Sequence, residues 1–283
     1  MNKDAAYYES RYNPRLAVPE FAQHFARWTE NSAKVRKDLS PYLDVPYGSS
    51  PLEKLDLFRS KGPSRGLLMF IHGGYWRALD KSQHSFVAAP FVQAGITVAT
   101  INYALCPAVT VADIVRQVLQ AAAWLFRNGG NFGAPQHKLH VAGHSAGGHL
   151  TATVLAAQWP RFAVDLPAKV VQGGLAISGV FDVSPIVHTP SINADVRLDA
   201  RMAKMVSPAL MPPATDAPLY LAVGGKEQEG FHEQHQLIKE NWGKRVAGEF
   251  ACPDDDHFTI LNTLADPNSA LFKGALKMMG HVS

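Results

Sequence analysis

The sequence is poor in cysteine and lacks the spacing patterns of common metal sites. Its 283 residues include two cysteines, Cys106 and Cys252, which are too few for a disulfide framework. We therefore expect two free thiols in a reducing cytoplasm. No CxxC and no HExxH pattern occurs, so neither a structural zinc nor a metalloprotease site is indicated. We predict no metal and no cofactor.

Long apolar runs and long charged runs are also missing. No uncharged apolar run reaches the length of a membrane span, and residues 1–10 carry no apolar core of a signal peptide. The net charge is +3, without long runs of lysine and arginine. These features argue against nucleic acid and membrane as partners. We expect a cytoplasmic protein with a small-molecule substrate, and the sequence leaves a homodimer open.

What the chain does contain is an alternation of apolar strands and helical patterns. We predict strands at Leu52–Phe58, Gly66–Ile71, Ile96–Tyr103, Lys138–Gly143, Val170–Ser178, Leu219–Gly224 and Val246–Cys252. We predict helices at about Pro19–Leu39, Ser82–Ala94, Val111–Arg127, Val196–Val206 and Phe231–Trp242, with a closing helix after Asn262. This order predicts an α/β fold with an open, mostly parallel sheet covered on both faces.

The chain shows no linker or repeat that would divide it. We therefore predict one domain over residues 1–283, with an N-terminal arm at 1–45 and an insertion at 181–217 near the site. In sheets of this kind, ligands bind at the carboxyl ends of the strands. The chemical candidates of this sequence fall at that end.

The central motif is Gly-x-Ser-x-Gly at Gly143, Ser145 and Gly147, placed between an apolar strand and a helical run. A serine in such a sharp turn is exposed at the top of a sheet, and side chains at the two flanking glycines would collide with neighbouring backbone. The following helix directs its free N–H groups at the reacting atoms. The motif predicts a nucleophilic serine.

A serine hydroxyl needs a base, and the base needs a carboxylate partner. Of the twelve histidines, His257 follows the last predicted strand, where the chain order Ser, acid, His places the base. We assign the other histidines considered to loop bracing (His72), to packing (His144 and His149) or to a solvated helix face (His232 and His235).

The acid is expected after the strand Leu219–Gly224. Glu227 lies three residues beyond this strand and is the first choice, with Glu229 as a weaker one. Asp182, after the preceding strand, is a third candidate, whose alternative role is to anchor its loop. We interpret residues 254–256, three aspartates next to His257, as a solvated turn.

Acyl transfer also needs backbone N–H donors for the oxyanion. Ala146 follows the serine at the helix start, and Gly73 and Gly74 follow the apolar strand Gly66–Ile71. These three residues are the predicted oxyanion hole. Four aromatic residues near strand ends are candidates for the lining of a substrate pocket: Tyr75, Trp76, Tyr103 and Phe231.

These motifs together resemble the α/β-hydrolase superfamily on its esterase/lipase side, and more narrowly the arylformamidase (kynurenine formamidase) family. The matching segments are Tyr12-Asn13-Pro14, His72-Gly73-Gly74-Tyr75-Trp76, Asn102-Tyr103 with Leu105-Cys106-Pro107, Gly143 to Leu150, Ser178 to Asp182, and Glu227 with Phe231. The resemblance implies an α/β-hydrolase fold, with Ser145 as nucleophile, Glu227 as acid and His257 as base. The acid of the animal enzymes is aspartate, so the glutamate here is a departure.

The resemblance and the residues together predict a metal-free serine hydrolase that cleaves a small acyl group through an acyl-enzyme. The first expectation is an aryl formamide such as N-formylkynurenine. The alternative is a carboxylesterase for short-chain or aryl esters. A remote alternative is a non-catalytic binding protein on a hydrolase fold, which would have no need for serine, histidine, acid and glycine loop together.

Overall fold

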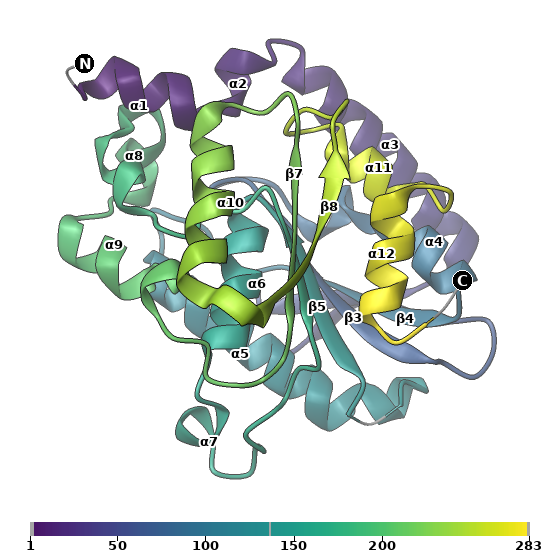
Figure 1. Cartoon of the computed structure of the whole chain (residues 1–283). Coiled ribbons are helices and arrows are strands. Elements are labelled where there is room, and N and C mark those ends of the chain that lie inside the picture. The colour runs from purple at the N-terminus through teal and green to yellow at the C-terminus, as the bar shows by residue number, and fades with distance from the viewer. Residues whose placement is uncertain (1–2, 136, 282–283) are drawn as a thin grey trace.

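An eight-stranded sheet runs through the molecule in the order β1-β2-β4-β3-β5-β6-β7-β8 (Figure 1). The structure is a computed structural model and describes residues 3–135 and 137–281. The strands are β1 (Tyr42–Pro46), β2 (Lys54–Phe58), β3 (Gly66–Ile71), β4 (Ile96–Ile101), β5 (Leu139–His144), β6 (Gly174–Ile177), β7 (Leu219–Gly224) and β8 (Val246–Cys252). Strand β2 runs antiparallel to β1 and β4, and all the other neighbouring pairs are parallel.

Helices cover both faces of the sheet, as the fold prediction requires. The helices are α1 (Ala5–Tyr12), α2 (Pro14–Ala17), α3 (Phe21–Leu39), α4 (Ala88–Gln93), α5 (Val111–Asn128), α6 (Ala146–Ala156), α7 (Trp159–Phe162), α8 (Pro190–Val196), α9 (Ala200–Val206), α10 (Glu229–Trp242), α11 (Ile260–Ala265) and α12 (Ala270–Met278). One hydrophobic cluster packs α5, α6 and α10 on one face, and a second packs α3, α4, α11 and α12 on the other (Figure 1).

Strand β3 shows why the sheet needs both layers. All six of its residues are buried. Leu67 and Met69 belong to the first cluster, whereas Leu68 and Phe70 belong to the second, because successive side chains of a strand point to opposite faces. A continuous apolar run is the expected pattern of a strand covered on both sides.

Several predicted boundaries need correction. The predicted helix Ser82–Ala94 begins as two short 3-10 turns and becomes α-helical only at α4. The predicted helix Val196–Val206 is interrupted, because Arg197 has left-handed backbone that ends α8, and Asp199 then caps α9. The predicted strand Val170–Ser178 is shorter, as β6. Strand β1 was not predicted, because it is an edge strand whose residues are mostly exposed and show no apolar alternation.

The N-terminal segment lies against the end of the sheet that carries the predicted chemistry. Helix α1 lies beside α8 and α10 (Figure 1). Arg11 forms ion pairs with Glu229, at 2.7 Å, and with Glu233, both on α10. Glu9 accepts hydrogen bonds from the backbone and hydroxyl of Ser191 at the start of α8. The arm and the insertion are thus joined directly to each other and to α10.

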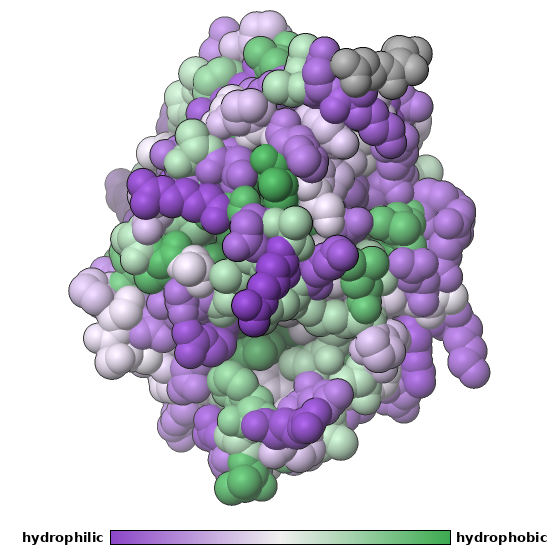
Figure 2. Space-filling view, turned by 90° about the vertical axis from the view of Figure 1, so that its left-hand side faces the viewer, coloured by the Kyte–Doolittle hydropathy of each residue, from purple (hydrophilic) through white to green (hydrophobic). Residues whose placement is uncertain are grey.

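The surface over α1, α8 and α9 is a mosaic in which hydrophobic side chains are interspersed with hydrophilic ones (Figure 2). Cys106 and Cys252 are buried free thiols. Within the residues that the structure describes, none of the helices combines the length and the apolar character that crossing a membrane would require.

Candidate active site

Ser145 lies in a sharp turn between β5 and α6. Its backbone has φ 58° and ψ −119°, a conformation that residues other than glycine rarely adopt. A Cβ atom on Gly147 would lie 2.0 Å from the carbonyl oxygen of Ile71, and one on Gly143 would lie 2.2 Å from that of Gly147. The two glycines are therefore required by close backbone approach, and the strained turn is held by strands on either side.

His257 meets Ser145 from the loop that follows β8. Its Nε2 atom lies 3.0 Å from Ser145 Oγ, and its Nδ1 atom lies 2.6 Å from Glu227 Oε2. Both side chains of the His257–Glu227 pair are buried. A serine hydroxyl, an imidazole and a carboxylate thus form one continuous hydrogen-bonded chain, the arrangement that activates a serine.

Glu227 is held in place through its second oxygen. Oε1 accepts hydrogen bonds from the backbone N–H of Gly224 at 2.7 Å and from Ser178 Oγ at 2.5 Å. The two alternative acids lie elsewhere: the side chain of Glu229 is 73% exposed and pairs with Arg11, and Asp182 accepts from the N–H of Ser184. The structure therefore brings only Glu227, among the three candidates, to His257.

Ser178 was not singled out from the sequence as a site residue. It follows β6 directly and has left-handed backbone, with φ 52°. This conformation directs its hydroxyl to the carboxylate of the next strand's loop. The signal available in the sequence was its place at a strand end in the segment Ser178–Asp182, without a chemical role attached.

The loop that carries His257 is fixed by a second histidine, His144, and by Asp256. His144 Nε2 donates to the carbonyl oxygen of His257 at 2.8 Å. Burial and the neighbouring His257 hold the pKa of His144 well below its usual range, so His144 stays neutral. Asp256 accepts from the N–H groups of Phe258 and Thr259.

The expectation of a solvated turn at residues 254–256 is therefore wrong in part. Asp255 is buried and accepts from the Thr263 hydroxyl at 2.7 Å. Of the three aspartates, only Asp254 is exposed. The run of like charges is tolerated because Asp255 and Asp256 each have their own hydrogen-bond donors in the loop and in α11.

The predicted oxyanion donors lie next to the serine. A Cβ on Gly73 would be 3.0 Å from Ser145 Cβ, so the glycine loop and the turn are in direct contact. Within the described residues, the N–H groups of Gly73, Gly74 and Ala146 donate no hydrogen bond. Gly74 has φ 105° and lines the same cavity as Ser145. Free N–H groups at this place suit a developing negative charge on a substrate oxygen.

Tyr103 and Asn102 hold the glycine loop from behind. The Tyr103 ring stacks on His72 with centroids 4.4 Å apart, and its hydroxyl donates to the carbonyl oxygen of His72 at 2.9 Å. Asn102 Oδ1 lies 3.1 Å from His72 Nε2, in keeping with the bracing role predicted for His72. The placement of Tyr103 in the pocket wall was wrong, because its ring and hydroxyl are fully used in supporting this loop.

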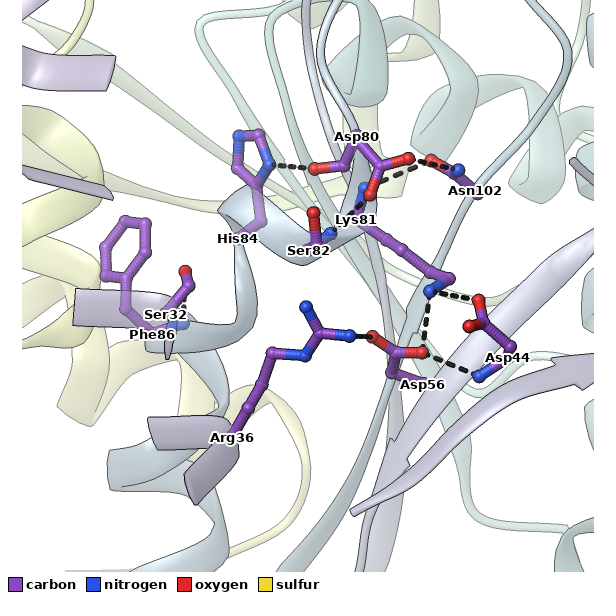
Figure 3. A network of polar contacts seen from close by, with 10 residues as sticks. All are labelled: Ser32, Arg36, Asp44, Asp56, Asp80, Lys81, Ser82, His84, Phe86 and Asn102. Carbon is purple, nitrogen blue, oxygen red and sulfur yellow. Dashed lines mark hydrogen bonds and ion pairs between the residues drawn. The ribbon is translucent and has the colours of Figure 1, made fainter. Parts of the chain in front are cut away.

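Asn102 also connects the loop to a partly buried ionic cluster, which we define as Arg36, Asp44, Asp56 and Lys81 (Figure 3). Lys81 Nζ lies 2.6 Å from Asp56 and 2.9 Å from Asp44, and Arg36 lies 3.4 Å from Asp56. The backbone N–H of Lys81 donates to Asn102 Oδ1. The cluster ties α3, β1 and β2 to the segment behind the glycine loop.

A cavity of about 500 Å³, part of it open to solvent, lies over Ser145 and His257. Its lining residues come from the N-terminal arm, the glycine loop, the turn, α8 and the His257 loop: Asn13, Pro14, Arg15, Phe25, Trp28, Gly74, Tyr75, Arg77, Leu79, His144, Ser145, Ile192, His257 and Phe258. The arm residues among them were not predicted individually.

Of the four aromatic residues proposed for the lining, the structure places Tyr75 there and removes the other three. Trp76 is fully buried and packs edge-on against His149, with centroids 5.0 Å apart. Phe231 is buried behind His257, at 4.4 Å between ring centroids, where it supports the imidazole. The cavity's aromatic walls are instead Phe25, Trp28 and Phe258.

Comparison with known proteins agrees with this arrangement. A family model described as BD-FAE matches residues 55–241. Kynurenine formamidase of Danio rerio is 30% identical, over 99% of this chain and 97% of its own length. The kynurenine formamidase of Drosophila melanogaster is also 30% identical, over 72% of this chain and 69% of its own.

Solved structures show the same fold. A protein of Silicibacter sp. tm1040, suggested to be a thioesterase, superposes with a TM-score of 0.82 at 33% identity, covering 96% of this chain and 97% of its own. Esterase B of Lactobacillus rhamnosis superposes with a TM-score of 0.68 at 17% identity, covering 92% and 93%. The chain therefore belongs to the arylformamidase and esterase-like family of α/β hydrolases.

Proposed function

We propose that the protein is a serine hydrolase that cleaves a small acyl group from an aryl formamide, such as N-formylkynurenine, through an acyl-enzyme. The observation that carries the proposal is the chain Ser145–His257–Glu227, at 3.0 and 2.6 Å, opening into a cavity beside unpaired N–H groups. The kynurenine formamidases similar over nearly the whole chain support the substrate class.

In the proposed reaction, Ser145 Oγ attacks the carbonyl carbon while His257 Nε2 takes the hydroxyl proton. The N–H groups of Gly73, Gly74 and Ala146 stabilise the oxyanion, and Glu227 stabilises the imidazolium. His257 then gives the proton to the departing amine, which leaves a formyl ester on the serine. Water, deprotonated by His257, hydrolyses this ester, so that formate and the free amine are the products.

A second candidate is a carboxylesterase for short-chain or aryl esters. It is favoured by the esterases among the similar folds and by the same site chemistry, since an ester is cleaved by the same steps with an alcohol as the leaving group. We include a cytoplasmic location in the proposal, in keeping with the buried free thiols Cys106 and Cys252. Fractionation of cells that express the protein checks the location.

The test combines labelling with turnover. A fluorophosphonate is expected to add one mass increment to the Ser145 peptide, and Ser145→Ala is expected to remove labelling and to lower kcat by about 10⁶-fold. Ser60→Ala, at a half-buried serine whose hydroxyl donates to the carbonyl oxygen of Gly62, is the matched control. A Ser145→Ala variant that keeps a tenth of wild-type kcat would overturn the nucleophile assignment.

Substrate class is tested by kcat/KM for N-formylkynurenine beside p-nitrophenyl esters from acetate to decanoate. We expect the formamide and the acetate to be cleaved well and the rate to fall gradually with chain length. Ester cleavage without formamide cleavage would leave the carboxylesterase standing. Ligand binding without any turnover would favour a non-catalytic binding protein.

A further inference from the structure

The cavity over Ser145 has an unbalanced charge. Two arginines, Arg15 and Arg77, line it, and its lining contains no aspartate or glutamate. Arg77 is paired, because its guanidinium contacts Asp195. Within the described residues, by contrast, Arg15 has no carboxylate at ion-pair distance. The mouth of the cavity therefore presents one uncompensated positive charge.

Arg15 is an exposed residue, but two aromatic rings position its guanidinium. Its guanidinium lies over the ring of Phe21, at 4.9 Å from the centroid, and near that of Phe25, at 5.8 Å. Its backbone N–H donates to Asn13 Oδ1 at 3.2 Å, and the neighbouring Pro14 is buried. Stacking on aromatic faces leaves the edge of a guanidinium, with its N–H donors, available for a ligand.

The electrostatics of the site also favour an anion beside Arg15. Partial burial and the positive charge of Arg77 lower the pKa of Arg15 below its ordinary value. The positive charge of Arg77 disfavours the charged guanidinium of Arg15, and a carboxylate bound beside Arg15 would offset this repulsion. The same anion would lie near Arg77, whose charge is already offset by Asp195 and faces Glu9.

We propose that Arg15 binds a carboxylate on the leaving group of the substrate, so that the enzyme prefers anionic aryl formamides and aryl esters to neutral ones. The inference rests on the proposed serine hydrolase function. In this arrangement the small acyl group lies at Ser145, the aryl ring against the aromatic wall that Phe25 and Phe258 form together, and the carboxylate beside Arg15. A guanidinium and a carboxylate form paired, charge-assisted hydrogen bonds that fix the orientation of the ligand.

The experiment compares matched substrates: 3- and 4-acetoxybenzoate against the corresponding acetoxybenzamides, which have the same shape without the charge. The readout is the ratio of kcat/KM for the acid to that for the amide. We expect wild type to prefer at least one acid, and Arg15→Gln to lower this ratio about 10- to 100-fold, the value of a hydrogen bond to a charged group. The loss should lie in KM rather than in kcat.

Two controls separate charge from structure. Arg15→Lys keeps the charge without the fork and should retain part of the preference, and added salt should weaken the preference of the wild type. Arg116→Gln removes an exposed arginine of α5 outside the cavity lining and should leave the ratio unchanged. A ratio near one in wild type, or an equal loss for acid and amide in Arg15→Gln, overturns the inference while leaving the hydrolase function intact. Wild type that cleaves neither substrate overturns the proposed function itself.

Discussion

The molecule contains two polar chains, each with a buried pair of side chains, and they differ in how they end. The chain Glu227–His257–Ser145 ends in a hydroxyl at the cavity. The ionic cluster of Arg36, Asp44, Asp56 and Lys81 ends in paired charges (Figure 3). Both have contacts of 2.6 Å between buried partners, so neither burial nor short distance distinguishes them.

The two chains differ in whether their charges are already paired. In the ionic cluster each positive charge faces a carboxylate, and the pairs offset the cost of removing charges from water. In the site, a neutral hydroxyl meets a histidine that can take its proton, and the resulting positive charge has Glu227 as its partner. In the proposed mechanism, the site differs from the ionic cluster because Glu227 is already placed to stabilise a positive charge that forms on His257 only during the reaction.

Glu227→Gln should lower kcat by about 10⁴-fold, equivalent to about 5.5 kcal/mol, with little change in folding. The amide keeps the shape of the side chain but stabilises neither the tautomer nor the charge of His257. Glu229→Gln and Asp182→Asn are the matched controls, because neither carboxylate reaches His257. Steady-state kinetics on the three variants decides the matter, and a larger loss in either control would move the acid assignment.

Lys81→Met should lower the free energy of unfolding by about 3–5 kcal/mol, because it leaves Asp56 buried with only the more distant Arg36. Urea unfolding gives this value. The effect on kcat/KM of the folded fraction should stay below tenfold, the reverse of Glu227→Gln. Lys81→Met combined with Asp56→Asn should recover part of the stability, since the buried charge is removed with its partner. If the double variant is less stable than Lys81→Met, the cluster does not act through charge pairing.

His149→Gln should reduce the loss of stability in acid by about 2–3 kcal/mol between pH 7 and pH 4.5. Burial lowers the pKa of His149 to about 4 from 6.5, and its Nε2 donates to Val206. Between pH 6.5 and pH 4, His149 is therefore protonated in the unfolded chain but neutral in the folded protein. Because the unfolded state binds the extra proton, the free energy of unfolding falls as the pH falls through this range. Urea titrations of both proteins at the two pH values give the difference. Parallel pH dependence in both proteins would contradict the prediction.

Trp76→Phe should cost about 2 kcal/mol of stability and leave the preference for acyl-chain length unchanged. Trp76 is fully buried against His149 and lies outside the cavity lining. The measurements are thermal unfolding and kcat/KM over the p-nitrophenyl ester series. A shift of the optimum to longer chains would return Trp76 to the pocket wall.

How much the sequence could predict depends on how local the cause was. The turn at Ser145 brings neighbouring backbone segments so close that only glycine fits at positions 143 and 147. These two glycines therefore predict the turn from the sequence. The order of strands and helices gave the sheet, and the order Ser, acid, His gave His257. Glu227 was separable from Glu229 because α10 begins at Glu229 and turns that side chain to solvent, although the sequence alone could only rank them.

The pocket lining could not be predicted, because it depends on the backbone of a strained loop. Gly74, Tyr75 and Trp76 all have positive φ, at 105°, 48° and 56°. This path turns Tyr75 to the cavity and Trp76 into the core, whereas sequence spacing treats them as equivalent neighbours. The edge strand β1 was not predicted for a different reason. Its side chains are mostly exposed, so its sequence shows no alternation of apolar and polar residues.

The cavity is lined by segments that are far apart in the sequence and are therefore synthesised at different times. Asn13 and Arg15 leave the exit tunnel early, whereas His257 and Phe258, which form the opposite wall, are added after the whole central sheet. A nascent chain stopped before β8 lacks both the proposed base, His257, and the part of the cavity wall that Phe258 forms. If the proposed function holds, hydrolysis is therefore expected only of chains whose synthesis has passed the loop after β8, and unfinished chains are expected to be inactive.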